Sequence, residues 1–316
     1  MKLKNLGELG IIKNIREKTH TPNEVLMGIG DDAAVLEFNK KQFLLCTTDA
    51  LVENVHFSLN YFNPWQIGAK AIEQNASDIA AMGGIPKYAV VSLMLPSNLD
   101  VNFVDRLYDG IGKTAKKYST SIVGGNISKS KDIIVSISML GFVEKKYLAL
   151  RSGAKKGDII LCSGDVGKSA AGLELLKKGK KGESIKNHLE PKCRLDLAGK
   201  LVKIGINSMI DISDGIASEV MHICEESKVG AVIYADKIPI SKDTIKDAKL
   251  LGKNHLDLAL YGGEDFELLF TAPKSKIKKL IGLGASVIGE ITDKKSGIKL
   301  IKNNKEIRLR KGFEHF

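Results

Sequence analysis

The segment PWQIGAKAIEQNASDIAAMGG, residues 64–84, has the pattern of one long helix between two strands. Proline is favoured in the first turn of a helix and glycine just past its end, so the helix is predicted to begin at Pro64 and to stop before Gly83. The flanking segments QFLLCTTDA (42–50) and KYAVVSLMLP (87–96) are apolar runs typical of buried strands. This order is typical of helices packed on a sheet.

Strand and helix patterns alternate along the rest of the chain. A helix is predicted at 100–118 and a strand at 131–144, and both patterns return later in the chain. The polar segment LRSGAKKGD (150–158) separates two halves of similar length. A chain of 316 residues exceeds the size at which a single core keeps growing. The prediction is therefore an α/β (α+β) protein with an N-terminal domain at 1–149 and a C-terminal domain at 150–316.

The composition indicates a soluble globular protein. Hydrophobic residues make up 43% of the chain and charged residues 27%, and no apolar run approaches the length of a membrane span. The four cysteines lie far apart and form no Cys-x-x-Cys pair, which favours free thiols in a reducing compartment. The N-terminal segment lacks the apolar region of a signal peptide, so the expected location is the cytoplasm.

The net charge of +11 allows two interpretations. A basic surface can bind nucleic acid, or it can be a solvated exterior that attracts small polyanions. Aromatic residues are only 6% of the chain and do not alternate with the lysine clusters at 177–182 and 274–279, as a base-stacking surface requires. The solvated surface is therefore favoured, and no nucleic-acid partner is predicted.

Asp78 interrupts an apolar arc of the helix predicted at 64–84. On a helical wheel it falls among isoleucines and alanines, whereas Lys70, Glu73 and Ser77 lie on the opposite side. A buried carboxylate without a partner is costly, so it must take up a proton, pair with a cation or bind a metal. An aspartate that caps a neighbouring loop explains the position equally well.

Other acids follow glycines or end apolar segments. They are Asp31, Asp32, Asp49, Asp211, Asp214, Glu264 and Asp265. Taken singly, Asp49 after Thr47 and Thr48 fits an ordinary turn at a strand end, and Ser213 or Asp214 fits a helix cap. Taken together, carboxylates at several strand ends and turns predict a site for Mg²⁺ ions, which usually accompany phosphates.

The segment CSGDVGKSAAG (162–172) contains Gly-Lys-Ser between a strand and a helix, but it is not a P-loop. Cys162 occupies the place of the first glycine of the motif GxxxxGK[ST]. A glycine-rich helix start with at most weak anion affinity is the favoured interpretation. If ATP binds to this chain, its site has a different architecture.

Seven motifs occur in the order seen in one known family. They are GIGDDAAVL, TTDALVENVHF, NASDIAAMGGIP, RSGAKKGD, IDISDG, GGEDFELLF and the terminal KGFEHF. On these motifs the chain resembles the thiamine-monophosphate kinase family, which belongs to the ATP-binding superfamily of aminoimidazole ribonucleotide synthetase and selenophosphate synthetase. The resemblance implies the two-domain fold of that superfamily, with mixed sheets packed against helices, and a homodimer. It also implies Mg²⁺-dependent transfer of the γ-phosphoryl group of ATP to thiamine monophosphate, the last step of thiamine diphosphate biosynthesis.

The same resemblance implies roles for individual residues. The implied Mg²⁺ ligands are Asp32, Thr47, Thr48, Asp49, Asp78, Asn126, Asp211 and Asp214. The implied ATP contacts are Tyr108, Gly125, Arg151 and Ser213. The implied contacts to thiamine monophosphate are His56, Glu264 and Phe313. Many family members have Gly-Gly-Asp where this chain has Gly-Gly-Asn at 124–126, in a segment predicted as a strand followed by a turn, and an amide brings no charge to a metal.

Elementary chemistry supports this interpretation independently of the resemblance. A phosphate acceptor is already ionised near neutral pH, so the main obstacle to transfer is repulsion between two anions rather than the lack of a base. His56 is therefore assigned to substrate contact, and no general base is predicted. Arg151 is expected at the ATP phosphates or in a linker ion pair. Phe313 is expected over the aromatic part of the substrate or packed on the core.

Three other functions remain open on the sequence alone. Aminoimidazole ribonucleotide synthetase shares the acidic sites, a nucleic-acid-binding module would use the positive charge, and a metal-dependent phosphohydrolase would release inorganic phosphate. Selenophosphate synthetase is disfavoured because no cysteine precedes Asp31. The hydrogenase-maturation relative is disfavoured because it ends in a reactive cysteine, whereas this chain ends in GFEHF.

Overall fold

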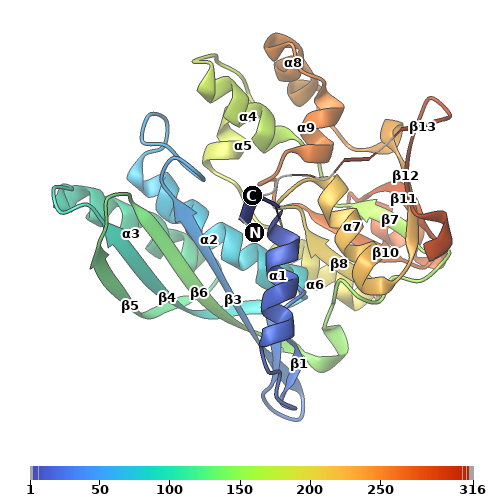
Figure 1. The fold of residues 1–316 in the computed structure, drawn as a ribbon, viewed down its shortest axis with the longest axis horizontal. Helices are drawn as coiled ribbons and strands as arrows, with labels where there is room; N and C mark the ends of the chain where they lie inside the picture. Colours follow the sequence, from blue (N-terminus) through green and yellow to red (C-terminus); the bar gives the residue numbers. More distant parts are fainter. Residues whose placement is uncertain (1–2, 6, 308, 311, 313–316) are drawn as a thin grey trace.

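The computed structural model describes residues 3–5, 7–307, 309–310 and 312. Its strands form two separate sheets, one from each half of the chain (Figure 1). The first sheet has the strand order β1-β2-β3-β6-β4-β5, in which β4 and β5 are parallel and the other neighbours antiparallel. The strands are Val25–Met27 (β1), Ala34–Glu37 (β2), Gln42–Val52 (β3), Ile85–Leu95 (β4), Ser121–Lys129 (β5) and Ile134–Glu144 (β6).

The second sheet is also mixed and has the order β13-β12-β9-β11-β7-β10-β8. Strands β9 and β12 are parallel, and the other neighbours are antiparallel. The strands are Ile159–Cys162 (β7), Ser208–Asp211 (β8), Gly230–Tyr234 (β9), Leu268–Ala272 (β10), Ser286–Thr292 (β11), Ile298–Lys302 (β12) and Lys305–Ile307 (β13). The division predicted between residues 149 and 150 falls between the last strand of the first sheet and the first strand of the second.

Two strands run further than the sequence pattern predicted. Strand β3 pairs with β6 from Gln42 to Val52, so Asp49 lies inside the strand and does not end it. Strand β5 pairs with β4 through the Gly-Gly-Asn segment at 124–126, where a turn was predicted. Both predicted ends were wrong because a paired neighbouring strand continues the ladder of hydrogen bonds past residues that are common in turns.

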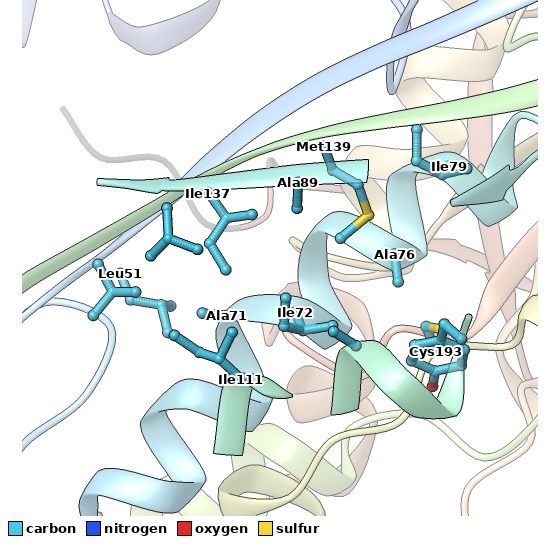
Figure 2. Packing of buried hydrophobic residues seen from close by; sticks show 14 of the residues in the cluster. Leu51, Ala71, Ile72, Ala76, Ile79, Ala89, Ile111, Ile137, Met139 and Cys193 are labelled. Carbon is cyan, nitrogen blue, oxygen red and sulfur yellow. The ribbon is translucent and has the colours of Figure 1, made fainter. Parts of the chain in front are cut away.

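Helix α2 (Pro64–Ala81) confirms the helix predicted at 64–84. Asn63 caps its start and, together with Gln66, forms a reciprocal capping box, and Pro64 occupies the first turn. Figure 2 shows Ala71, Ile72 and Ala76 of this helix packed beneath the first sheet, near Ile137 and Met139 of β6. These contacts build the core of the first half.

Helix α2 is buried on all sides, which the sequence pattern did not predict. The predicted polar side holds Lys70, Glu73 and Ser77, whose exposed fractions are 0%, 4% and 0%. The helix contacts β3 and β6 of the first sheet and also β8 and helix α6 (Leu195–Ile204) of the second half (Figure 1). Its polar residues therefore face the other half of the protein instead of solvent.

The other helices cover the two sheets. Helix α3 (Val101–Lys117), predicted at 100–118, begins at the N-cap Asp100 and packs against α2. The others are α1 (Gly7–Lys18), α4 (Lys168–Lys177), α5 (Ile185–Leu189), α7 (Ile216–Ser227), α8 (Lys242–Leu251), α9 (His255–Tyr261) and α10 (Ile277–Ile281). Among the helices within the described ranges, none combines the length and the apolar character that crossing a bilayer requires.

Candidate active site

A cleft of about 2340 Å³ is lined by residues from both halves of the chain. Pockets for one drug-sized molecule measure roughly 300–1,000 Å³, so this cleft has room for two substrates. The predicted site residues that line it are Asp32, Thr47, Thr48, Asp49, His56, Asp78, Arg151, Asp211, Ser213, Asp214 and Glu264. Acids that are scattered along the sequence therefore converge in one place.

Three of the acids that line the cleft form a close cluster. Carboxylate oxygens of Asp32, Asp78 and Asp211 all lie within 4.8 Å of one another. The Oδ2 atom of Asp32 is buried and has no hydrogen-bond partner among the described residues. Burial raises the pKa of all three acids, that of Asp211 to about 8, and for Asp78 the charge of Asp49 raises it further. Such a cluster of oxygens with an unpaired acceptor fits a hard divalent cation.

Two buried side chains of α2 orient acids of the cluster and its surroundings. The Ser77 hydroxyl donates a hydrogen bond of 2.6 Å to Oδ2 of Asp211 at the end of β8. The Gln74 side chain forms a hydrogen bond with Asp49 of β3. Burial raises the pKa of Asp49 to about 6, although the hydrogen bond from Gln74 acts in the opposite direction. The polar stripe of α2 thus holds carboxylates from both halves of the protein.

The two threonines of β3 differ in their surroundings. Thr47 is buried, and its Oγ1 donates to Oδ2 of Asp78 at 2.6 Å. Thr48 points to the other face of the sheet, where its Oγ1 lies 3.0 Å from Oγ of Ser138 on β6. Thr47 is therefore the threonine that contacts the acidic cluster directly.

The loop after β8 is held by Glu219, which the sequence analysis did not identify. The backbone N–H groups of Ser213 and Asp214 donate to its Oε1 at 3.2 and 2.8 Å. Helix α7 has Gly215 at its N-cap, so the interpretation of Ser213 or Asp214 as a side-chain cap was wrong. Burial and then the charge of Asp214 raise the pKa of Glu219 well above its usual range. In the sequence, the sign of this role was an acidic residue in the first turn of the helix that follows IDISDG.

Arg151, just after the first sheet, binds both aspartates of the GIGDD motif. Its Nε lies 3.1 Å from Oδ1 of Asp32, and its backbone N–H donates to Oδ2 of Asp31 at 3.1 Å. Burial and then the charge of Asp32 raise the pKa of Asp31 to about 7. Asp31 therefore fixes the backbone at Arg151, whereas Asp32 faces the acidic cluster.

Glu264 lies in the loop between α9 and β10, with a left-handed backbone (φ +62°). Its N–H donates to the carbonyl of Ser213 at 2.7 Å. A Cβ atom on Gly263 would lie 1.9 Å from that same carbonyl, so the loop that holds Glu264 packs in direct backbone contact with the loop after β8. The Glu264 carboxylate pairs with the buried ammonium of Lys70 on α2 at 2.6 Å. Non-glycine residues hold such a backbone only where the surroundings enforce it, which is common at functional sites.

Asp265 was grouped with Glu264 in the sequence analysis, but it caps a helix. Its carboxylate accepts the N–H groups of Gly167 and Ser169 at the start of α4. The glycine-rich segment at 162–172 therefore has its helix N-terminus neutralised by an acid of the same chain, so it is not available to a phosphate.

His56 follows β3 and lines the cleft. Its Nδ1 accepts the backbone N–H of Val52 at 3.1 Å, which leaves the proton of the neutral ring on Nε2. Its backbone carbonyl accepts a hydrogen bond of 2.9 Å from Lys70.

Three predicted residues do not line the cleft of their own chain. Tyr108 lies on α3, and Gly125 and Asn126 lie on β5, the terminal strand of the first sheet (Figure 1). A Cβ atom on Gly125 would lie 2.0 Å from the carbonyl of Val91, so pairing of β5 with β4 requires glycine there. Phe313 lies outside the described residues.

Comparisons with known proteins match both halves of the chain. The N-terminal domain of AIR synthase related proteins matches residues 30–143, and the C-terminal domain of the same proteins matches residues 155–301. The thiamine-monophosphate kinase of Aquifex aeolicus (strain VF5) is 38% identical and covers 100% of both chains. That of Bacillus subtilis (strain 168) is 35% identical, over 98% of this chain and 100% of the relative.

Solved structures share the fold along the whole chain. The structure described as AaThiL complexed with AMPPCP and TMP has a TM-score of 0.90 at 38% identity and covers 100% of this chain and 99% of its own. The hydrogenase maturation protein HypE in complex with ATP has a TM-score of 0.74 at 19% identity, covers 89% and 88% of the two chains, and shares the fold alone. The two-domain fold with mixed sheets is therefore confirmed. On its full-length identity to these relatives, the chain belongs to the thiamine-monophosphate kinase family.

Proposed function

We propose that this chain transfers the γ-phosphoryl group of ATP to thiamine monophosphate, giving ADP and thiamine diphosphate, the last step of thiamine diphosphate biosynthesis. The observation that carries the proposal is the convergence of acids from both halves of a basic chain in one cleft with room for two substrates. Relatives named for this activity and the related structure with AMPPCP and TMP support the same assignment.

Asp32, Asp78 and Asp211 would hold Mg²⁺ in the cleft, and their carboxylate oxygens within 4.8 Å of one another support this. We assign further contacts to Mg²⁺ to Thr47, Asp49, Asp214 and Asn126, and to Thr48 through its backbone carbonyl, because its hydroxyl faces the other side of the sheet. Bound Mg²⁺ would neutralise phosphate charge and align the reacting groups for in-line transfer.

The remaining work of the chain is to bind and orient two anions. We assign Arg151 and Ser213 to the ATP phosphates, because a guanidinium matches phosphate oxygens in charge and geometry. We assign His56, Glu264 and Phe313 to thiamine monophosphate. No residue is assigned as a general base, since the attacking oxygen belongs to a phosphate that is already ionised.

We also propose a homodimer in which a second copy packs on the outer face of the first sheet. Tyr88 and Val90 on this face of β4 are 39% and 40% exposed, and Asn126 on β5 pairs in register with Ser92 on the same face. Exposed apolar side chains gathered on one face of a sheet favour a protein partner. A second copy would also allow Tyr108 and Asn126 to reach a cleft that they do not line in their own chain. Sedimentation of a Val90→Asp variant tests this, with a monomer expected.

We assign residues 1–149 to the dimer face and to the first acids of the site, and residues 150–316 to completing the nucleotide and substrate site. The cysteines Cys46, Cys162, Cys193 and Cys224 are all free thiols. Free thiols persist in reducing compartments, which supports a cytoplasmic location.

Product analysis after incubation with ATP, MgCl₂ and thiamine monophosphate tests the proposed activity. We expect ADP and thiamine diphosphate in equal amounts, and neither in excess EDTA. Inorganic phosphate without thiamine diphosphate would identify a phosphohydrolase instead. ADP release only with the substrate of aminoimidazole ribonucleotide synthetase would favour that enzyme, and salt-sensitive nucleic-acid binding without ATP turnover would favour a binding module.

A further inference from the structure

The ammonium group of Lys70 on α2 joins two residues that we assign to thiamine monophosphate. Its side chain is completely buried, and its Nζ lies 2.6 Å from Oε1 of Glu264 and 2.9 Å from the carbonyl oxygen of His56. The ring centroid of Phe62 lies 5.3 Å from the same nitrogen, within range of a cation–π contact. Glu264 belongs to the second half of the chain and His56 to the first, so one cation connects both halves.

Lys70 supplies the positive charge that balances Glu264. His188 is a second basic group beside this carboxylate, with its Nδ1 3.5 Å from Oε2. Burial and then the charge of Lys70 lower the pKa of His188 to about 4, so its ring is neutral at neutral pH. Burial alone would raise the pKa of Glu264, but Lys70 and the neighbouring histidines lower it below its usual range. The carboxylate is therefore anionic, and its side chain is 26% exposed.

The geometry also shows what the ion pair holds in place. Glu264 has a left-handed backbone, and its loop has no regular secondary structure of its own. Helix α2, in contrast, is a regular helix with a capped start, and it is buried among elements of both halves of the chain. An ionic hydrogen bond to a buried helix residue therefore adds to the backbone contacts of this loop by fixing the direction of the Glu264 carboxylate.

We propose that Lys70 is a positioning residue for thiamine monophosphate, which sets the Glu264 carboxylate and the His56 backbone relative to each other at the substrate end of the cleft. The inference rests on the proposed function, because that function assigns Glu264 and His56 to this substrate. Lys70 itself is completely buried and acts through Glu264 and His56, not through a contact of its own with the reacting phosphates.

Steady-state kinetics of Lys70→Met, Glu264→Gln and the double variant test the proposal. Lys70→Met is expected to raise KM for thiamine monophosphate by about tenfold or more, because a misplaced contact group loses most of its binding contribution. KM for ATP should stay within about twofold of the wild-type value. Calorimetric binding of thiamine monophosphate without ATP should weaken by the same factor as KM rises.

The double variant separates positioning from a general structural role. If Lys70 acts through Glu264, Lys70→Met adds less than about twofold to the effect of Glu264→Gln. Multiplicative effects, or equal losses for ATP and thiamine monophosphate, would overturn the proposal. The double variant also removes both charges, so it leaves no unpaired buried ion and provides a folded protein if Lys70→Met alone does not fold.

Lys117→Met is the matched control. Lys117 forms an ion pair that also involves helix α2, with Glu73 at 3.0 Å, and it lies outside the cleft. It should leave KM for thiamine monophosphate unchanged. Wild-type protein that forms no thiamine diphosphate would refute the proposed function itself. Wild-type turnover together with normal thiamine monophosphate binding by Lys70→Met would refute only the role of Lys70.

Discussion

The hydroxyl of Ser77 on α2 donates a hydrogen bond of 2.6 Å to the carboxylate of Asp211 at the end of β8, and both side chains are almost completely buried. The bond joins the central helix of the first half to an acid of the second half. We predict that Ser77→Ala lowers the affinity for Mg²⁺ by about tenfold, because residues that orient metal ligands typically contribute 10- to 100-fold. The Mg²⁺ concentration at half-maximal rate measures this.

The control for Ser77→Ala is Ser208→Ala. Ser208 also makes a buried hydroxyl hydrogen bond, to Thr271 at 2.7 Å, but neither residue lines the cleft. It should lower the free energy of unfolding by about 1 kcal/mol without changing the Mg²⁺ dependence. Equal Mg²⁺ dependence in both variants would contradict the role of Ser77.

Asp78→Asn is predicted to abolish turnover and leave the fold intact. The substitution removes one carboxylate from a cluster whose members repel one another, so the metal-free protein should be at least as stable as the wild type near pH 8. Thermal melts with and without Mg²⁺ and assays of thiamine diphosphate check both parts. Asp100→Asn, which keeps a capping side chain at the start of α3, is the control and should be active. Normal activity of a folded Asp78→Asn protein would exclude Asp78 as a ligand.

The stability of the metal-free protein is predicted to fall as pH rises from about 6 to about 8. Burial raises the pKa of Asp211 to about 8 and that of Asp31 to about 7, whereas an unfolded aspartate has a pKa near 3.9. The folded state therefore keeps protons that the unfolded state has lost, and the stability present below about pH 4 is lost as pH rises through these raised values.

Mg²⁺ is predicted to raise the melting temperature more at about pH 8 than at about pH 6. At the higher pH the carboxylates have already lost their protons, so Mg²⁺ would not have to displace them. Differential scanning calorimetry at both pH values measures this. An Mg²⁺-induced shift that is equal at both, or larger at the lower pH, would show that the raised pKa values do not belong to the metal site.

The periodicity of residues 64–81 correctly predicted helix α2 and drew attention to Asp78, but it did not predict the surroundings of Lys70 and Ser77. Both were expected on the opposite side from the core. Ser77 is buried against Asp211 at the end of β8, and Lys70 is buried beside Glu264 in the loop after α9, so both meet residues of the second half of the chain. A helical wheel describes one packing face, and a second face supplied by distant residues leaves no local signal.

The adjacent acids Glu264 and Asp265 also show what the sequence could not predict. Glycines beside acids correctly drew attention to the loop at 262–267, yet Glu264 faces the cleft while Asp265 caps α4. Which of two neighbouring carboxylates faces a ligand depends on a reversal of one backbone torsion, here the left-handed φ of Glu264. At a residue other than glycine, the sequence gives no sign that the backbone adopts a positive φ.

Asn126→Asp is predicted to lower the Mg²⁺ concentration needed for half-maximal rate. Asn126 lies on β5, away from the cleft of its own chain, so the effect requires the proposed dimer to bring it to a site. A carboxylate there would add a charged oxygen ligand. The control is Asn126→Asp combined with Val90→Asp, which should lose the gain as the dimer dissociates. No change in Mg²⁺ dependence for Asn126→Asp alone would mean that position 126 faces no metal.

Gly263→Ala is predicted to raise KM for thiamine monophosphate and to lower the free energy of unfolding by about 1–3 kcal/mol. The added methyl group would lie 1.9 Å from the backbone carbonyl of Ser213, which cannot move without displacing the loop after β8. Glu264 would shift with Gly263, away from the ammonium of Lys70 on α2. Gly112→Ala is the control: nothing lies within 4 Å of a Cβ atom there, and alanine in the interior of α3 should stabilise the protein by about 0.5–1 kcal/mol. The atoms nearest to that methyl group are backbone atoms of Ser213 and Asp214, so a Gly263→Ala protein with unchanged stability and KM would mean that this close approach does not set the position of Glu264.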